Sequence, residues 1–206
     1  MRRAAHNEQR LTRANYFVEE DVHELLSPQS MFFIKMCDDS SWLYVEDELH
    51  EPEWGWALQL FHRGYGVSVR YPGEVKQSDA PRMLFTCEPG RHEGHVRIRS
   101  RATDTFLFFL GLRPPLTLVA WDRDVMGGDW EDMKLVWLNR GREPTGGDDS
   151  GRVIVRSRAL HSFVTWNGTR FVHTRSKESA TVFMLQRMTT AGGGSPAGAA
   201  AGGPRL

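Results

Sequence analysis

The sequence predicts an all-β fold of three similar units, each with four strands, preceded by a short helix and followed by a glycine-rich tail. The first observation is an internal repeat: residues 94–111 align without a gap with residues 151–168, and eight of the eighteen positions are identical. Two sequences of average composition would share about one. The second observation is a weaker copy upstream, in residues 32–45. The third is that the units follow the two-residue period of half-buried strands.

The strands follow from this period and from the turn residues that bound it. Val153 and Val155 alternate with polar neighbours, and β-branched and aromatic residues are frequent. The strands of the first unit are expected at residues 31–36, 41–45, inside 54–70, and 83–87. Those of the second are expected at residues 95–100, 105–110, 116–121 and 133–138. Those of the third are expected around Val153 and Phe163, at 170–174 and at 181–185.

Three units of four strands fit a closed barrel that is capped by hairpins, because such a barrel leaves no exposed sheet edge. One hairpin is predicted at Asn167-Gly168, a dipeptide typical of type I′ turns with positive φ at both residues. The alignment further predicts two sets of equivalent positions: Phe32, Val96 and Val153, and Trp42, Phe106 and Phe163.

The repeat resembles that of the fascin-like β-trefoils, a fold also used by the hisactophilins. The resemblance covers roughly residues 31–188 and rests on Val96-Arg97-Ile98-Arg99-Ser100 and its copy Val153-Ile154-Val155-Arg156-Ser157, each followed by a strand that contains Phe. It implies a β-trefoil that acts as a non-enzymatic interaction module and binds a protein partner, with actin as the cytoskeletal candidate. Where that family has Gly-Lys-Tyr-Leu, this chain has Asp104-Thr105-Phe106-Leu107 and His161-Ser162-Phe163-Val164.

Two segments flank the expected trefoil domain of residues 29–189. Within residues 1–28, Val18, Val22 and Leu25 recur at helical spacing among acidic residues, which predicts a short amphipathic helix. Two interpretations stay open: the helix packs on its own domain, or its apolar face docks on a partner. Residues 190–206 are rich in Gly and Ala and are expected to form a disordered tail, because they cannot bury enough surface to offset their ordering entropy.

Arginines recur at equivalent places in the second and third units. The candidate binding residues are Arg97, Arg99, Arg101, Arg152, Arg156 and Arg158. On one interpretation, outward strand positions simply carry polar side chains. On the other, the guanidinium groups bind phosphates or an acidic protein, because such forks pair with these groups. Exposed aromatics among them would favour single-stranded nucleic acid or a ribonucleoprotein, the alternative to a protein partner. Two interpretations stay open for Phe108, Phe109, Trp121 and Trp166: they are such exposed aromatics, or they belong to the core.

Composition narrows the function classes. The chain has 206 residues, 40% of them hydrophobic, and a net charge of zero, which allows one sizeable core and gives no overall attraction to polyanions. No apolar run has membrane-spanning length, and the two cysteines are expected as reduced thiols of a cytoplasmic protein, or a nuclear or organellar one. Residues 122–131 lack the alternating oxygen ligands of a calcium loop. No catalytic motif occurs, so no enzyme, cofactor, metal or small-molecule ligand is expected.

Overall fold

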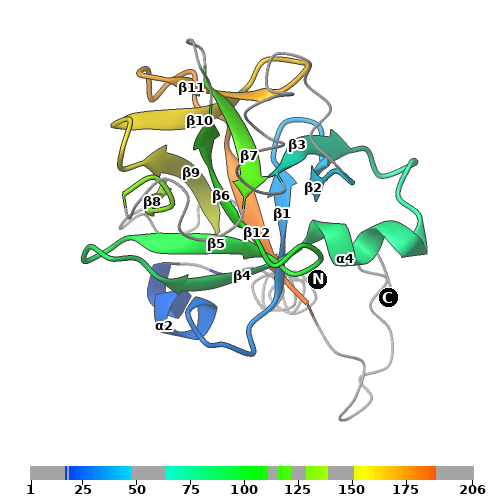
Figure 1. Cartoon of the computed structure of the whole chain (residues 1–206), viewed down its shortest axis with the longest axis horizontal. Helices are drawn as coiled ribbons and strands as arrows, with labels where there is room; N and C mark the ends of the chain where they lie inside the picture. Colours follow the sequence, from blue (N-terminus) through cyan, green and yellow to red (C-terminus); the bar gives the residue numbers. More distant parts are fainter. Residues whose placement is uncertain are drawn as a thin grey trace, which may run out of the picture.

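The computed structural model describes residues 17, 19–47, 64–110, 116–121, 129–138 and 151–188. Within these ranges the fold is all-β, as predicted, and its twelve strands form one continuous sheet (Figure 1). The first four strands are β1 (Phe32–Met36), β2 (Trp42–Val45), β3 (Gly64–Arg70) and β4 (Leu84–Pro89). The next four are β5 (Val96–Ser100), β6 (Phe106–Leu110), β7 (Thr117–Trp121) and β8 (Met133–Trp137). The last four are β9 (Arg152–Ser157), β10 (Ser162–Trp166), β11 (Phe171–Thr174) and β12 (Phe183–Arg187).

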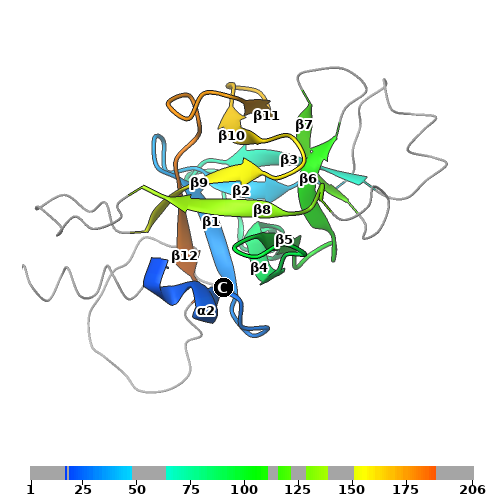
Figure 2. The ribbon, with the colours of Figure 1, turned by 90° about the vertical axis from the view of Figure 1, so that its left-hand side faces the viewer.

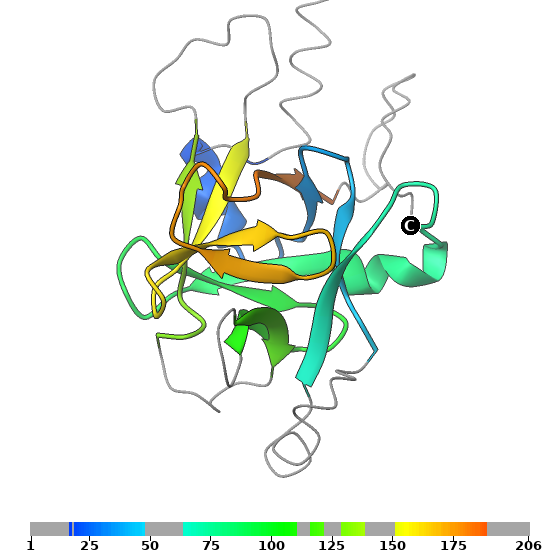
Figure 3. The same ribbon diagram turned by 90° about the horizontal axis from the view of Figure 1, so that it is seen from above.

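Six of the strands close into a ring. Antiparallel pairing runs from β1 to β4, β5, β8, β9 and β12 and back to β1, so the barrel has no free edge. The other six form the hairpins β2–β3, β6–β7 and β10–β11, which contact one another through β3–β7 and β7–β11. Figure 3 shows this arrangement from above. The closed barrel with hairpins, which the sequence predicted, is therefore observed.

The strand registers repeat along the chain. At the start of each first strand the cross-strand partners are Phe32 and Phe85, Val96 and Met133, and Val153 and Phe183. Between the first and second strands the partners are Lys35 and Trp42, Arg99 and Phe106, and Arg156 and Phe163. Residues that the sequence alignment made equivalent thus occupy the same place in the ladder.

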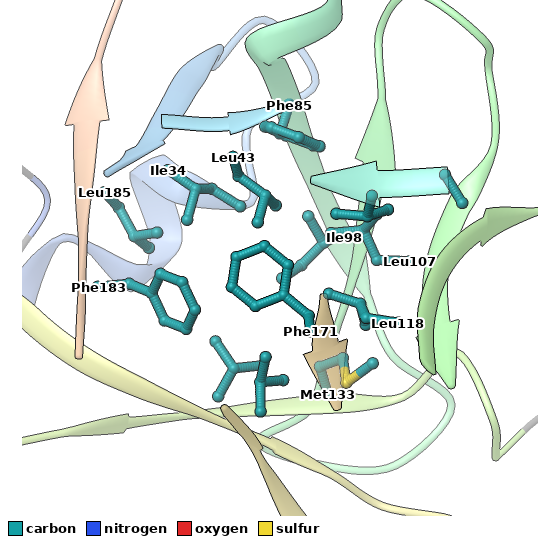
Figure 4. Close-up of a cluster of buried hydrophobic side chains, with 14 of the residues drawn as sticks. Ile34, Leu43, Phe85, Ile98, Leu107, Leu118, Met133, Phe171, Phe183 and Leu185 are labelled. Atoms are coloured by element: carbon teal, nitrogen blue, oxygen red, sulfur yellow. The ribbon is translucent and has the colours of Figure 1, made fainter. Parts of the chain in front are cut away.

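The core fills the barrel with side chains from all the ring strands and from the hairpins. Figure 4 shows Phe171 of β11 in the middle of this core, among Leu43, Phe183 and Leu118. Phe171 is fully buried, as are Phe85 and Phe106. A cavity of about 20 Å³ remains, lined by apolar residues that include Ile34, Ile98 and Val155. It has room for about one water molecule and offers it no polar partner.

Helices occupy little of the described chain. At the N-terminal end, the 3₁₀ helix η1 (Glu19–Asp21) leads into α2 (Val22–Leu25), which is shorter than the expected amphipathic helix. Figure 2 shows α2 beside β12 and β1, away from the β10–β11 hairpin. A second helical segment, η3 (Gln77–Asp79) and α4 (Ala80–Met83), precedes β4 and was not predicted. No helix in the described ranges is both long and apolar enough to cross a bilayer.

The turn at Asn167 and Gly168 differs from the prediction. Gly168 has a φ of +94°, but Asn167 is not among the residues with positive φ, so the type I′ assignment is wrong. Instead, the side-chain oxygen of Asn167 accepts hydrogen bonds from the backbone N–H groups of Thr169 (3.1 Å) and Arg170 (3.0 Å). This side chain stabilises a longer loop, because Asn readily bonds to backbone groups two or three residues on. The expected tail at residues 190–206 lies outside the described residues.

Candidate binding surface

Each of the three first strands places a cation beside an aromatic ring at its outer face. The charged group lies 5.5 Å from the ring centroid for Lys35 over Trp42, 5.7 Å for Arg99 over Phe106, and 5.9 Å for Arg156 over Phe163. These distances are typical of cation–π contacts. The recurrence of basic residues in the sequence thus has a structural role, because each of these three cations lies over an aromatic ring in the first two residues of the neighbouring strand.

In the second unit the outward arginines are matched by carboxylates. Glu88 on β4 accepts from Arg97 and from Arg99, both at 3.1 Å, and Arg97 also lies 3.8 Å from Glu131. Asp104 forms a further ion pair with Arg99. Partial burial alone would lower the pKa of Arg99, but its hydrogen bonds and charge contacts with Asp104 and Glu88 raise it overall. Arg97 and Arg99 therefore form ion pairs with acidic residues of the same surface.

The other candidate arginines have different surroundings. Arg158 lies 3.6 Å from Asp129, and Arg152 is half-buried on β9 opposite Met184. Arg101 is exposed in the turn after β5, where its backbone N–H donates to the carbonyl of Leu84. The structure thus places the six arginines on related turns and strands, and at least three of them form ion pairs.

The aromatic residues expected between the arginines belong to the interior. Phe108, Phe109 and Trp121 are at most 4% exposed. Trp166 is half-buried, with its ring centroid 4.8 Å from that of Phe171. Of the two interpretations of these aromatics, the structure supports the core one for these three side chains, because strands β6 and β7 bury both of their faces.

The N-terminal helix packs on its own domain. Leu25 is fully buried in the main core with Phe17, whereas Val22 is half-buried and Val18 lies outside the described residues. Arg187 of β12 holds this segment: its guanidinium lies 4.4 Å from the Phe17 ring centroid and 2.8 Å from Glu24. Leu25 therefore supports the first of the two open interpretations, while the half-buried Val22 keeps an accessible side chain that a partner could contact.

The structure brings together a cluster of polar side chains, His92, Asp129 and Asp132, that was not predicted from the sequence. Nδ1 of His92 lies 2.8 Å from Oδ2 of Asp132 and 3.5 Å from Asp129, and the three ligand atoms lie within 4.8 Å of one another. Such a set could coordinate a divalent cation. However, buried Asp132 already accepts from the backbone N–H groups of Arg91 and His92, so the cluster is also explained as an anchor for this turn. His92 lies about forty residues before the two aspartates, so no local spacing in the sequence indicates the contact.

Two further groups have perturbed pKa values. Burial raises the pKa of the Cys87 thiol well above its usual range, and both Cys87 and Cys37 are free thiols. Burial, and then the charge of Arg175, lowers the pKa of His173, whose ring lies 6.0 Å from that of Phe109. A thiol that resists ionisation is a poor nucleophile, so Cys87 acts as a core residue.

The turns between the first and second strands share an unusual backbone conformation. Ser40, Asp104 and His161 have φ values of +60°, +63° and +50°, and each lies one or two residues before the start of a second strand. Glycine adopts this region without strain, whereas other residues do so at a cost. Asp104 and His161 are the two positions at which the chain departs from the glycine of the fascin-like pattern.

Known proteins resemble this chain in structure only. No protein-family model and no curated protein matches the sequence. Among solved structures, the designed threefold symmetric protein ThreeFoil is 11% identical, with a TM-score of 0.53 over 77% of this chain and 99% of that one. The BEL β-trefoil is 14% identical, with a TM-score of 0.52 over 78% of this chain and 94% of that one.

A salivary protein from Culex, of the Cysteine and Tryptophan-Rich family, is 12% identical, with a TM-score of 0.54 over 78% of this chain and 95% of that one. None of these three is described as a fascin or a hisactophilin, so that part of the resemblance stays a prediction. At such low identities the likeness shows the fold and no function. The fold of this chain is that of the β-trefoil proteins.

Proposed function

We propose that the protein is a non-enzymatic binding module, a β-trefoil of three equivalent units, and that its partner is another protein. The observation that carries this proposal is the pairing of outward arginines with acids of the same surface, centred on Glu88. A surface on which both signs alternate suits complementary contacts with a protein. A nucleic acid instead requires a row of cations that are free to neutralise phosphates.

Actin is the specific partner that the fascin-like repeat suggests, with a cytoplasmic location. This assignment is supported by the sequence pattern alone. Asp104 and His161 stand where the fascin-like pattern has glycine, so these surface turns differ in chemistry from those of the pattern. Direct co-sedimentation with actin filaments tests this version, and failure to pellet with the filaments would remove it.

The experiment that tests the proposal is capture of partners from native extract, with half of the sample treated with nuclease. We expect a protein partner that survives nuclease treatment. In parallel, labelled single-stranded RNA and DNA are titrated at two salt concentrations, and we expect no salt-sensitive binding. Affinity whose logarithm falls linearly with that of salt, and falls further when Arg97, Arg99 and Arg156 are neutralised, would support the nucleic-acid alternative and overturn a protein partner.

A pair of variants examines the contribution of the N-terminal helix. Val22→Asp alters its half-buried face, whereas Leu25→Asp places a carboxylate in the core. We expect Leu25→Asp to unfold the domain, because an unpaired buried charge is strongly destabilising. Val22→Asp should remain folded. Loss of partner capture by folded Val22→Asp would place the interface on the helix, and retained capture would place it on the barrel.

A further inference from the structure

The β8–β9 seam carries two cations that face each other. The register sets Lys134 directly opposite Arg156, so both side chains lie on the outer face of the barrel. Among the described strand pairs, one other pair of charged residues lies directly opposite each other: Glu88 and Arg97. These two have opposite signs. Like charges opposite each other destabilise a sheet, so the β8–β9 pair calls for a counter-charge.

No residue of this chain supplies that counter-charge in the described structure. Lys134 is exposed, and the side-chain contact of Arg156 is the ring of Phe163 at 5.9 Å. Among the described residues neither cation forms an ion pair, although other arginines of the same barrel do. The ring fixes one face of the guanidinium and leaves its N–H groups available for a ligand.

The equivalent arginine of the second unit, Arg99, has the acidic partners that Arg156 lacks among the described residues. Pairing of Phe85 with Ser100 and of Met133 with Ser157 sets the two seams in the same register, so that Arg156 corresponds to Arg99. Arg99 is neutralised by Glu88 and Asp104. At the β8–β9 seam, Val136 stands at the position of Glu88. In the turn after β9, His161 stands at the position of Asp104 and likewise has a positive φ. Both acids are thus replaced at the one seam that also gains a lysine.

We propose that Lys134, Arg156 and His161 form a binding site for a phosphate monoester on the outer face of β8 and β9. A phosphate monoester carries a charge of about −1.5 to −2 at neutral pH, which matches two fixed cations. Guanidinium and ammonium groups donate charge-assisted hydrogen bonds to its oxygens, and an imidazole N–H adds a further donor. The site goes beyond the proposed protein partner and does not depend on that partner's identity.

The test is isothermal titration calorimetry of the full chain with phenyl phosphate at low ionic strength. We expect one site, with affinity lowered about tenfold in Arg156→Gln and in Lys134→Gln, the loss of one charge-assisted hydrogen bond. His161→Asp restores the acid of the second unit and should abolish binding without removing a cation. Arg101→Gln removes the same charge from an exposed turn of the second unit and should change the affinity less than twofold.

Two further ligands separate the sources of the oxyanion. Inorganic phosphate should bind at the same site and compete with phenyl phosphate, whereas phenyl sulfate, with a single charge, should bind at least tenfold more weakly. Absence of phenyl phosphate binding, equal binding of the sulfate, or unchanged affinity in folded Arg156→Gln and His161→Asp would each overturn the proposal. Thermal denaturation of every variant checks that it is folded. Since these ligands contain no protein, the outcome is distinct from that of the partner-capture experiment.

Discussion

Between β4 and β5 the barrel sets Glu88 opposite Arg97, whereas at the same place between β8 and β9 it sets Val136 opposite Ile154. Two residues along the strands, Thr86 faces Arg99 in the first seam and Lys134 faces Arg156 in the second. The β4–β5 seam thus pairs its arginines with carboxylates, whereas the β8–β9 seam joins an aliphatic pair to two cations that form no ion pair with any described residue. Because both seams keep one register, the backbone pairing does not require either set of charges.

This comparison indicates that the residues on the outer face of the barrel can vary, whereas those on the inner face are constrained by packing. Inward residues such as Ile98 and Val155 are buried in both seams. We expect the seam with ion pairs to gain local stability from them, whereas the cations of the other seam have no acidic partner among the described residues. Four sets of variants test this difference.

The largest expected effect comes from the ring beneath each arginine. Phe106 is 1% exposed, whereas Phe163 is half-buried. Phe106→Ala should lower the free energy of unfolding by about 3–5 kcal/mol, the cost of removing a fully buried Phe side chain. Phe163→Ala should cost about half as much. Urea denaturation measures both, and equal losses would contradict the difference in burial between the two seams.

Removing the shared carboxylate should open the β4–β5 network. Glu88→Gln leaves Arg97, whose side chain is 13% exposed, with only the longer contact to Glu131. We expect a loss of about 1–2 kcal/mol, because a charged hydrogen bond of a largely buried group is lost. Glu93→Gln, at an exposed turn, is the matched control and should have no effect. A loss that is no larger in Glu88→Gln than in the control would show that the network adds no stability.

The turns that precede β6 and β10 should respond differently to glycine. His161→Gly relieves the positive φ at 161 and should raise the free energy of unfolding by about 0.5–1 kcal/mol. Asp104→Gly relieves the same conformation but removes an ion pair with Arg99, so we expect little net change. Thermal denaturation of the two variants measures this. Stabilisation of equal size in both variants would mean that the ion pair between Asp104 and Arg99 contributes nothing to the free energy of unfolding.

The smallest effect is expected at the like-charge pair. Lys134→Thr introduces the residue that the β4–β5 seam has at this place and removes the repulsion from Arg156. The free energy of unfolding should rise by about 0.2–1 kcal/mol at low ionic strength, and the gain should shrink as salt screens the repulsion in wild type. Chemical denaturation at two salt concentrations measures the gain. A gain that is independent of salt would point to strand propensity instead of charge.

The strands could be predicted because both of their signals are local. Where the sequence gave bounds, alternation and turn residues located the strands to within two residues of their observed ends, whereas β3 was placed only somewhere inside residues 54–70. The repeat aligned the units in the register that the barrel uses. The segment η3 and α4 was missed because its reason is tertiary. Met83 and Leu84 cover Phe33, Trp42 and Tyr44 on the outer face of the first unit. That cover buries β2 on both faces, and no periodicity in four residues reveals it.

The candidate site could be predicted only in part. The arginine repeat located the side chains, since outward positions recur with the strand period. Their partners, Glu88, Asp104 and Asp129, come from other strands and turns, and their pairing depends on the barrel geometry. Lys134 could not be predicted as a site residue, because it belongs to a fourth strand and lies opposite Arg156 only through the register of β8 with β9.

The closure of the ring between its first and last strands has a consequence for how the chain is made. β1 pairs with β12 along its whole length, with Ile34 opposite Leu185, and Phe17 and Glu24 contact Arg187 of the same last strand. A ribosome synthesises β12 after every other strand. Until it emerges, β1 has only its contacts with β2 and β4, and the N-terminal segment has no Arg187 to bind. We therefore expect the N-terminal end of this domain to be ordered last, after β12 has been translated, although it is the first part of the domain to leave the ribosome.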